Sequence, residues 1–531
     1  MAQEAERKAI AGRAGIIGLG TLVSRLLGLG RDITLAASFT LGQTDAFWIA
    51  FTLPNAFRQL LAEGAVNSAV LPVLTKVRED EGDDAARIFF ARARGLSIVG
   101  LAIVTLLGVV FAEPLVRLFA GGFAARPGQL ERTVLLTRWV FPYLFFMGTA
   151  ALGVAALHTY KRFVVASFAP ALLNVAFIGA SFGLPAWLAA HGRDPTLALA
   201  AAVLVGGALQ MIAQWPSLRA IGFHALPRFD LRDPHIRTVL RRIGPMALGL
   251  GVYYVDLVVC RRLLSGQGEG AQSYFAWAQR LCDFPQGIFV MALSAATLPS
   301  LAALAAKGDR EELGRTLGFG IGLSLFVAIP VAAVFFVLGE PLVVALFQRG
   351  KFDAHAAAET ARALRFQGLG IISVAVVRQL VPAFFALGDT RTPVIVSGLD
   401  LAALVAFAYL LVGPFGHVGV SIAVAGSSTV QMVLLVLALR RRVPTAGEGV
   451  LRSIANTGLA SLVAGGAAQA SLGLGRGLLT GGPIARLVPA LVSGLVFLVV
   501  FVAVARAAKS KELLLVGSMV GRRILRRAVA P

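Results

Sequence analysis

The chain has 531 residues, of which 57% are hydrophobic and 15% charged, and its mean hydropathy is +0.78. These values lie far outside the range of soluble globular proteins and indicate an integral membrane protein. The formal net charge is +21 and the isoelectric point is near 11.2, which would also suit nucleic-acid binding. The distribution of the basic residues decides between these two readings.

Apolar runs of about 20 residues, the length that crosses a bilayer, recur along the whole chain. We therefore predict an all-α polytopic membrane protein with about 14 transmembrane helices. The approximate spans are 13–37, 43–75, 95–120, 133–157, 163–190, 196–218, 238–262, 271–305, 315–347, 357–387, 393–413, 416–439, 453–474 and 483–506. The first span is too long and too charged for a cleaved signal peptide, so we expect it to remain in the mature protein.

Most of the 49 Lys and Arg residues lie in every second connector, beginning with residues 1–13 and ending with the tail from Arg506. This bias predicts that both termini are cytoplasmic and argues against a nucleic-acid partner. The terminal "GRRILRR" is expected to anchor on the anionic inner leaflet. The two cysteines, Cys260 and Cys282, imply neither a metal cluster nor a disulfide framework. The sequence contains no "GKS" or "GKT" motif, so ATP hydrolysis by this chain is not expected.

The chain contains an internal repeat. "SAVLPVL" at 68–74 matches "AATLPSL" at 295–301, and "FAEPLVRLF" at 111–119 matches "LGEPLVVALF" at 338–347, so that Pro72 aligns with Pro299 and Glu113 with Glu340 in one register. An even number of spans separates the two copies, which predicts two parallel six-helix repeats, or lobes, around a central cavity. The predicted divisions are 1–225, 235–445, and 450–531 for two extra helices and a basic tail. Chance recurrence in a biased composition is the alternative.

Four of the arginines within the predicted spans stand out: Arg25, Arg31, Arg58 and Arg280. Arg58 follows Asp45 by 13 residues, which places it about 20 Å deeper along a straight helix. Together the four would cost on the order of 10 kcal/mol if they faced lipid. A hydrated cavity removes most of that cost. Because the planar guanidinium fork suits phosphate, we expect an anionic substrate that carries a phosphate or pyrophosphate.

Carboxylates lie near these arginines in the sequence: Asp32, Asp45, Glu63 and Asp283. Asp32 follows Arg25 by seven residues, so the two share a helix face if the helix is unbroken. Other arginines near span ends, namely Arg117, Arg138, Arg261 and Arg262, are expected to reach the interface or to pair structurally.

Five stretches carry a family resemblance: "TLVSRLLGLGRD" at 21–32, "TDAFWIAFTLPNAFRQLLAEGAVNSAVLPVL" at 44–74, "AQRLCDFPQGIFVMALSAATLPSL" at 278–301, "LFQRGKF" at 346–352 and "GDTRTPV" at 388–394. The chain resembles the MurJ (MviN) family of bacterial lipid II flippases, within the multidrug/oligosaccharidyl-lipid/polysaccharide exporter superfamily. The resemblance implies two six-helix lobes plus two C-terminal helices. It also implies a transporter, not an enzyme, that moves undecaprenyl-pyrophosphate-linked disaccharide-pentapeptide from the cytoplasmic to the periplasmic leaflet of the bacterial inner membrane.

The resemblance marks Arg25, Arg31, Arg58 and Arg280 as binding the pyrophosphate headgroup. It gives Asp45 a gating or conformational role, which we extend as an expectation to Asp32, Glu63 and Asp283. Two residues depart from the family pattern: Gln279, where some relatives carry an acid, and Thr52, where some carry a lysine.

Some relatives bind sodium in the second lobe, where Asp256 and Asp400 are candidate counterparts here, and structural ion pairing is the other reading. No cofactor is expected, and a sodium gradient or the membrane potential is the candidate energy source. Besides lipid II, the expected partners are membrane lipids and cell-wall synthesis enzymes, in a pathway that builds peptidoglycan and sets cell shape.

Two other classes of function are alternatives. A cation-coupled drug exporter, or an exporter of another lipid-linked oligosaccharide, belongs to the same superfamily, but a drug antiporter needs an acidic, aromatic-rich cavity. A membrane enzyme of cell-wall synthesis needs a catalytic domain above the membrane, and outer connectors such as "GRDPT" and "GPFGHVG" are too short for one. The two C-terminal spans are expected to form an apolar groove for the lipid tail.

Overall fold

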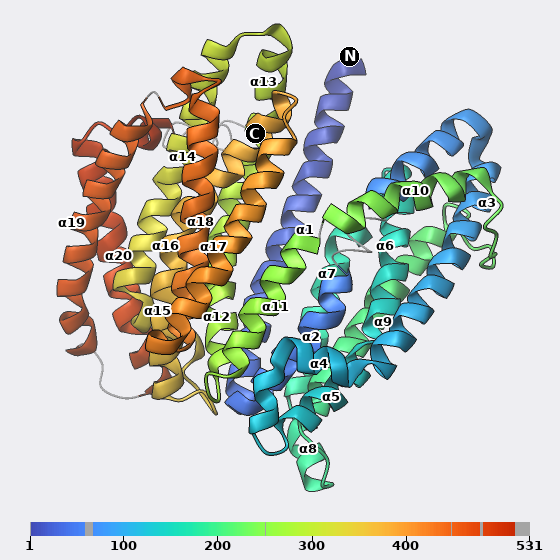
Figure 1. Cartoon of the computed structure of the whole chain (residues 1–531), viewed down its shortest axis with the longest axis horizontal. Coiled ribbons are helices and arrows are strands. Elements are labelled where there is room, and N and C mark those ends of the chain that lie inside the picture. Colours follow the sequence, from blue (N-terminus) through green and yellow to red (C-terminus); the bar gives the residue numbers. More distant parts are fainter. Residues whose placement is uncertain (1, 59–66, 250, 448, 478–481, 516–531) are drawn as a thin grey trace, which may run out of the picture. The chain divides into compact units, whose positions relative to one another are not determined.

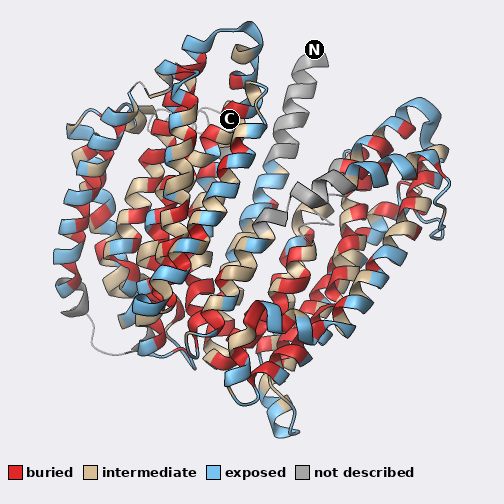
Figure 2. Ribbon diagram, viewed as in Figure 1, coloured by how far each residue is buried: buried red, intermediate tan, exposed pale blue. Residues whose placement is uncertain are grey.

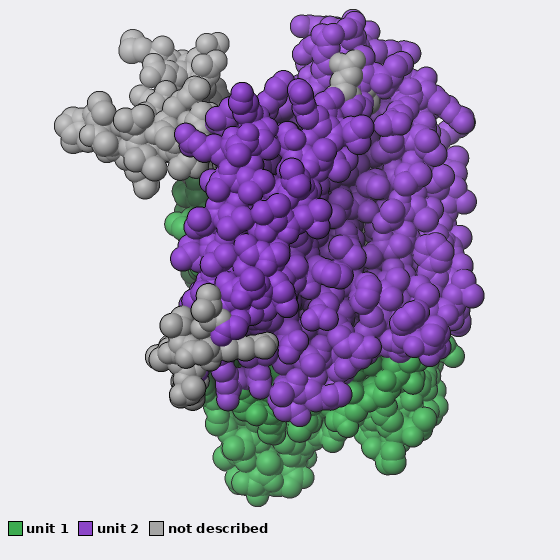
Figure 3. Space-filling view, turned by 90° about the vertical axis from the view of Figure 1, so that its left-hand side faces the viewer, with its two compact units in different colours: residues 1–272, 349–352 green, residues 273–348, 353–531 purple. Residues whose placement is uncertain are grey.

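The computed structural model describes residues 2–58, 67–249, 251–447, 449–477 and 482–515, and the regular elements in these ranges are all helices (Figure 1). Contacts divide the chain into two compact units. Unit 1 holds residues 1–272 and 349–352, and unit 2 holds residues 273–348 and 353–531 (Figure 3).

Unit 1 contains eleven helices in chain order, most of them joined by short connectors. They are α1 (Ala2–Ser38), α2 (Leu41–Arg58), α3 (Asn67–Val110), α4 (Ala112–Ala120), α5 (Gln129–Val140), α6 (Tyr143–Thr159), α7 (Val164–Ser181), α8 (Leu184–Ala190), α9 (Leu197–Arg219), α10 (Pro234–Gly249) and α11 (Gly251–Ser265). One apolar core lies between α3, α6 and α10, where the rings of Phe90 and Phe223 meet edge to face at 4.6 Å. Within each unit the buried residues gather on the helix faces that meet one another (Figure 2).

Unit 2 begins within α12 (Ala271–Pro285), which a π-helical turn (Gln286–Val290) joins to α13 (Met291–Lys307). The following helices are α14 (Arg310–Val337), α15 (Gly339–Phe347), α16 (Ala354–Ala386), α17 (Arg391–Phe415), α18 (His417–Arg440), α19 (Val450–Gly477) and α20 (Gly482–Ala507). Asp309 caps α14 by accepting the Glu312 N–H, and Asp353 caps α16 by accepting the Ala356 N–H. Such caps satisfy backbone donors that a helix start leaves unpaired.

The polar segment 76–94, predicted as a connector, lies within α3. Its arginines, glutamates and alanines are good helix formers, so the helix continues beyond the apolar run. Gly82 interrupts it with φ 90°, a conformation that favours glycine. The predicted span 133–157 lies within one membrane-length segment, Gln129–Thr159, in which α5 ends at Val140 and Pro142, which lacks an N–H, precedes α6.

Nine helical segments of the described residues are long and apolar enough to cross a membrane. They are Ala69–Val110, Gln129–Thr159, Val164–Ser181, Leu197–Arg219, Arg310–Val337, Ala354–Ala386, Arg391–Phe415, His417–Arg440 and Ala485–Ala507. Large apolar side chains on them are exposed, such as Leu410 at 70% and Leu491 at 67%. Lipid solvates such surfaces, so the prediction of an all-helical membrane protein is confirmed. The count of 14 spans and the division into two parallel repeats stay predictions.

Candidate functional site

A polar cluster in unit 1 joins α1 to α7. Arg31 donates to Asp32 Oδ1 from Nε at 2.9 Å and from Nη2 at 2.8 Å, and its Nη1 donates to Asn174 Oδ1 at 3.2 Å. The guanidinium carbon also lies 5.6 Å from the centroid of the Phe177 ring. Asp32 is buried, so the pair is held in a low-dielectric setting where an unpaired charge would be costly. The cluster fixes the direction in which the Arg31 fork points.

Arg25 and Arg58 are half-buried on α1 and α2. Arg58 is the last residue of α2, and its Nε donates to Asn55 Oδ1 at 2.9 Å. The sequence places Asp32 and Arg25 on one helix face, and in the structure the Asp32 carboxylate is paired with the neighbouring Arg31. The predicted gating residue Glu63 lies outside the described residues.

Asp45 is fully buried near the start of α2. Its Oδ2 accepts the Gly270 N–H at 2.7 Å and lies 3.6 Å from Arg126 Nη1. A second bond runs between the same two segments, because Glu269 Oε1 accepts the Gly42 N–H at 2.8 Å. The carboxylate therefore ties the start of α2 to the connector between α11 and α12, which suits a residue that stabilises one conformation.

In unit 2, Arg280 lies half-buried on α12 and Asp283 is exposed on the same helix. Asp283 Oδ1 accepts the Gln279 Nε2–H at 2.9 Å, so the residue that departs from the family pattern bonds to this acid. The other departure, Thr52, donates to the carbonyl of Trp48 in its own helix at 2.6 Å. Directly after α12 the chain forms the π-helical turn, a feature that often marks functional sites.

The two candidate sodium ligands lie in different units. Asp256 on α11 accepts from Cys260 Sγ at 3.5 Å, and Asp400 on α17 has a buried Oδ1 with no hydrogen-bond donor in the described part of the chain. An acceptor of this kind fits a cation or a proton. Three or more His, Cys, Asp or Glu side chains do not gather at any point among the described residues, so the sodium site stays a prediction.

The arginines near span ends make structural contacts. Arg117 pairs with Glu113 at 2.8 Å, and Arg262 Nη1 donates to the carbonyls of Arg117 and Leu118. Arg261 Nη1 donates to Gln272 Oε1 at 3.0 Å, and Arg138 is exposed on α5. These positions agree with the structural interpretation of this group.

Sequence reasoning missed three residues that the structure brings to notice. Asn174 orients Arg31 and also donates to the carbonyl of Ser24 at 2.9 Å, and Arg126 faces Asp45. Arg378 is a further cationic residue within α16, and its carbonyl accepts the Ser294 hydroxyl at 2.6 Å. Asn174 and Arg378 could have been identified from the sequence, because each is a polar residue inside a predicted apolar span.

Comparison with solved structures identifies the fold of the chain. The chain matches a structure described as "Lipid II flippase MurJ, inward closed conformation" with a TM-score of 0.74 at 20% identity, over 92% of this chain and 99% of that one. It also matches an inward-facing multidrug resistance MATE transporter of the MOP superfamily, with a TM-score of 0.69 at 17% identity, over 80% of this chain and 96% of that one. The chain therefore has the same helical fold as these two structures.

Residues 37–475 match the family model described as "Lipid II flippase MurJ". The "Lipid II flippase MurJ" of Burkholderia cenocepacia is 34% identical over 427 residues, which cover 80% of this chain and 82% of that protein. The "Probable lipid II flippase MurJ" of Bdellovibrio bacteriovorus is 34% identical over 450 residues, covering 84% and 85%. The chain belongs to the MurJ family of lipid II flippases. The predicted resemblance is confirmed, and with it the assignment to transport in peptidoglycan synthesis rather than to enzymatic catalysis.

Proposed function

We propose that this protein carries lipid II from the cytoplasmic to the periplasmic leaflet of the bacterial inner membrane by alternating access. The observation that carries the proposal is the family match over residues 37–475. In such a cycle a cavity between two six-helix lobes opens first to one side and then to the other. The headgroup stays hydrated in the cavity while the polyprenyl tail remains among lipids.

The substrate-binding residues in this proposal are Arg25, Arg31 and Arg58 of unit 1 and Arg280 of unit 2. Guanidinium groups bind phosphate oxygens through paired hydrogen bonds, and burial strengthens such contacts. The oriented fork of Arg31 supports its assignment. Because Asp32 neutralises Arg31, the pyrophosphate must compete with this carboxylate for the guanidinium.

The remaining carboxylates take conformational roles in the proposal. Asp45 holds the start of α2, and Asp32, Glu63 and Asp283 act in gating as the cavity changes its opening. Asp256 and Asp400 are the candidate sodium ligands that would couple transport to an ion gradient, with the membrane potential as the other energy source. The C-terminal helices α19 and α20 guide the lipid tail along an apolar groove.

Depletion of the native protein followed by complementation tests this site. Wild type is expected to restore wall synthesis, whereas the variants Arg25→Ala, Arg31→Ala, Arg58→Ala and Arg280→Ala are expected to fail while inserting normally. Arg138→Ala is the matched control, because Arg138 is exposed near a span end. A direct assay of lipid II reaching the outer leaflet should detect transport by wild type and Arg138→Ala, and none by the four arginine variants. Normal growth with all four variants would overturn the site assignment, and transport of a cationic drug without lipid II would favour the antiporter alternative.

A further inference from the structure

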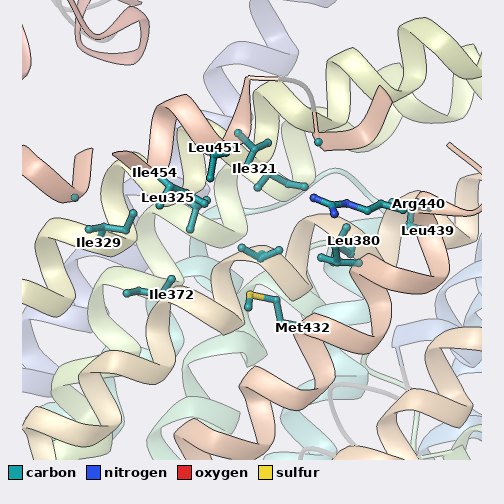
Figure 4. A pocket seen from close by; sticks show the side chains of 15 residues that line it. Ile321, Leu325, Ile329, Ile372, Leu380, Met432, Leu439, Arg440, Leu451 and Ile454 are labelled. Carbon is teal, nitrogen blue, oxygen red and sulfur yellow. The ribbon is translucent and has the colours of Figure 1, made fainter. Parts of the chain in front are cut away.

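Unit 2 contains an apolar pocket between four helices. Side chains of α14, α16, α18 and α19 line it, among them Leu325, Ile372, Met432 and Ile454 (Figure 4). Its volume is about 490 Å³, within the range of small-molecule sites. Its lining includes none of the arginines assigned to the lipid II headgroup.

Among the described residues that line this pocket, one side chain is charged. Arg440 is the last residue of α18 and is exposed, and Figure 4 shows its guanidinium directed back over the apolar side chains from one end. A Cβ built on Gly447 would lie 3.4 Å from Arg440 Nη2, so the guanidinium sits beside the backbone of this connector. Among the described residues the Arg440 side chain has no ion pair, whereas nearby Arg442 pairs with Asp389 at 2.8 Å.

The pocket also has an exposed apolar margin. Leu451, near the start of α19, is 78% exposed, and Ile454 one turn later is 41% exposed. In a membrane protein such side chains contact acyl chains rather than water. Three consecutive arginines, residues 440–442, and Arg452 place positive charge at this end of the helices. The predicted orientation puts this end at the cytoplasmic leaflet, whose anionic lipids attract clustered basic residues.

We propose that this pocket binds one anionic membrane phospholipid, with an acyl chain among the apolar side chains and the phosphate on Arg440. Charge complementarity selects this occupant. A zwitterionic lipid offers the arginine a headgroup without net charge, and a soluble phosphate leaves the apolar walls unfilled. The proposal concerns a resident lipid rather than the transported substrate, and it does not depend on the proposed direction of flipping.

Two substitutions test the apolar part and the charged part of the pocket separately. Gly458 lines it and has open space around its Cβ position, so Gly458→Leu fills the pocket without a clash at Cβ. Gly466→Leu is its matched control, because Gly466 is on the same helix, has equally open space and lies outside the pocket. Arg440→Gln removes the charge, and Arg506→Gln is the control, since Arg506 is exposed in the last turn of α20.

The measurement is native mass spectrometry of the purified full chain, titrated with phosphatidylglycerol or with phosphatidylcholine. Wild type is expected to retain phosphatidylglycerol preferentially. Arg440→Gln should weaken that binding about five-fold, the effect of one arginine near an anionic surface. Gly458→Leu should abolish the first bound lipid, and both controls should behave as wild type.

Three outcomes would overturn the proposal. Equal binding of both lipids by wild type would remove the role of charge. Unchanged phosphatidylglycerol binding in both Gly458→Leu and Arg440→Gln would place the lipid elsewhere. Displacement of the bound lipid by undecaprenyl phosphate would assign the pocket to the polyprenyl tail instead. Because the readout is lipid binding, a failure here leaves the lipid II complementation result untouched.

Discussion

The Asp45 carboxylate is a buried charge that accepts a backbone hydrogen bond and faces an arginine, which makes its contribution to stability testable. Asp45→Ala leaves the Gly270 N–H without its acceptor and removes the carboxylate that lies 3.6 Å from Arg126 Nη1. Removal of one partner from a buried charged network costs about 3 kcal/mol. We expect a clearly lower unfolding midpoint for Asp45→Ala than for wild type in detergent, measured by fluorescence-detected size exclusion. Asp84→Ala is the control, because the Asp84 side chain is 90% exposed. Equal midpoints for the two variants would contradict this role of Asp45.

Asp194 provides a pH-dependent test outside the spans, in the connector between α8 and α9. Burial raises the pKa of Asp194, but hydrogen bonds from Arg132, at 2.7 Å, and from Thr196 outweigh it, so the pKa lies below its ordinary value. A lowered folded-state pKa gives stability that is present above the unfolded-state pKa and is lost as the pH falls through the folded-state value.

We therefore expect Asp194→Asn to be less stable than wild type at pH 7, by about 1 kcal/mol for a partly exposed charged hydrogen bond. The difference should narrow as the pH falls through 3.8, the ordinary carboxyl pKa, towards the lower folded-state value, because the carboxylate then becomes protonated in both states. Unfolding midpoints of both proteins between pH 7 and about pH 2 measure this narrowing. A difference that stays constant over this range would exclude an ionised Asp194 as its source.

At the scale of helices, hydropathy predicted where the apolar runs lie but not where the helices end. The segment 76–94 is too polar for a span and still helical within α3, because helix formation and membrane insertion depend on different properties.

The partners of individual side chains could be predicted from the sequence even less well than the helix ends. The spacing of Arg25 and Asp32 predicted a shared helix face, but it could not show that Asp32 pairs with Arg31 or that the packing of α1 on α7 brings Asn174 to Arg31. Such contacts need the tertiary structure, since Asn174 is far away in sequence.

Two glycines of α3 differ in their surroundings, so they form a matched pair for testing helix packing. A Cβ on Gly108 would overlap the buried ring of Phe141, whereas a Cβ on Gly100 meets nothing within 4 Å. Gly108→Ala should destabilise unit 1 by about 1–3 kcal/mol through overpacking. Gly100→Ala should be neutral or stabilising by up to about 1 kcal/mol through helix propensity. Detergent unfolding midpoints in the opposite order would refute the close approach at Gly108.

The two C-terminal helices form a hydrophobic core with α14 in unit 2, where Phe497 and Phe501 pack near Phe326. This packing gives α19 and α20 a structural role besides the proposed guidance of the lipid tail. Deletion from residue 450 onward is expected to abolish flipping in a protein that still inserts. Retained lipid II transport by the truncated chain would refute the tail-guiding groove.

The orientation of the whole molecule follows from its basic connectors and can be measured without any transport assay. The positive-inside rule places the connectors after α13 and α16 in the cytoplasm and the connector between α8 and α9 outside. Alkaline phosphatase, which is active only outside the cytoplasm, should therefore be active when fused after Gly192 and inactive when fused after Gly308 or Gly388. A fluorescent protein that folds only in the cytoplasm should give the reverse pattern at the same three sites. If both reporters favoured the opposite sides, the termini would lie outside, and the proposed cytoplasmic loading of the headgroup would have to be abandoned.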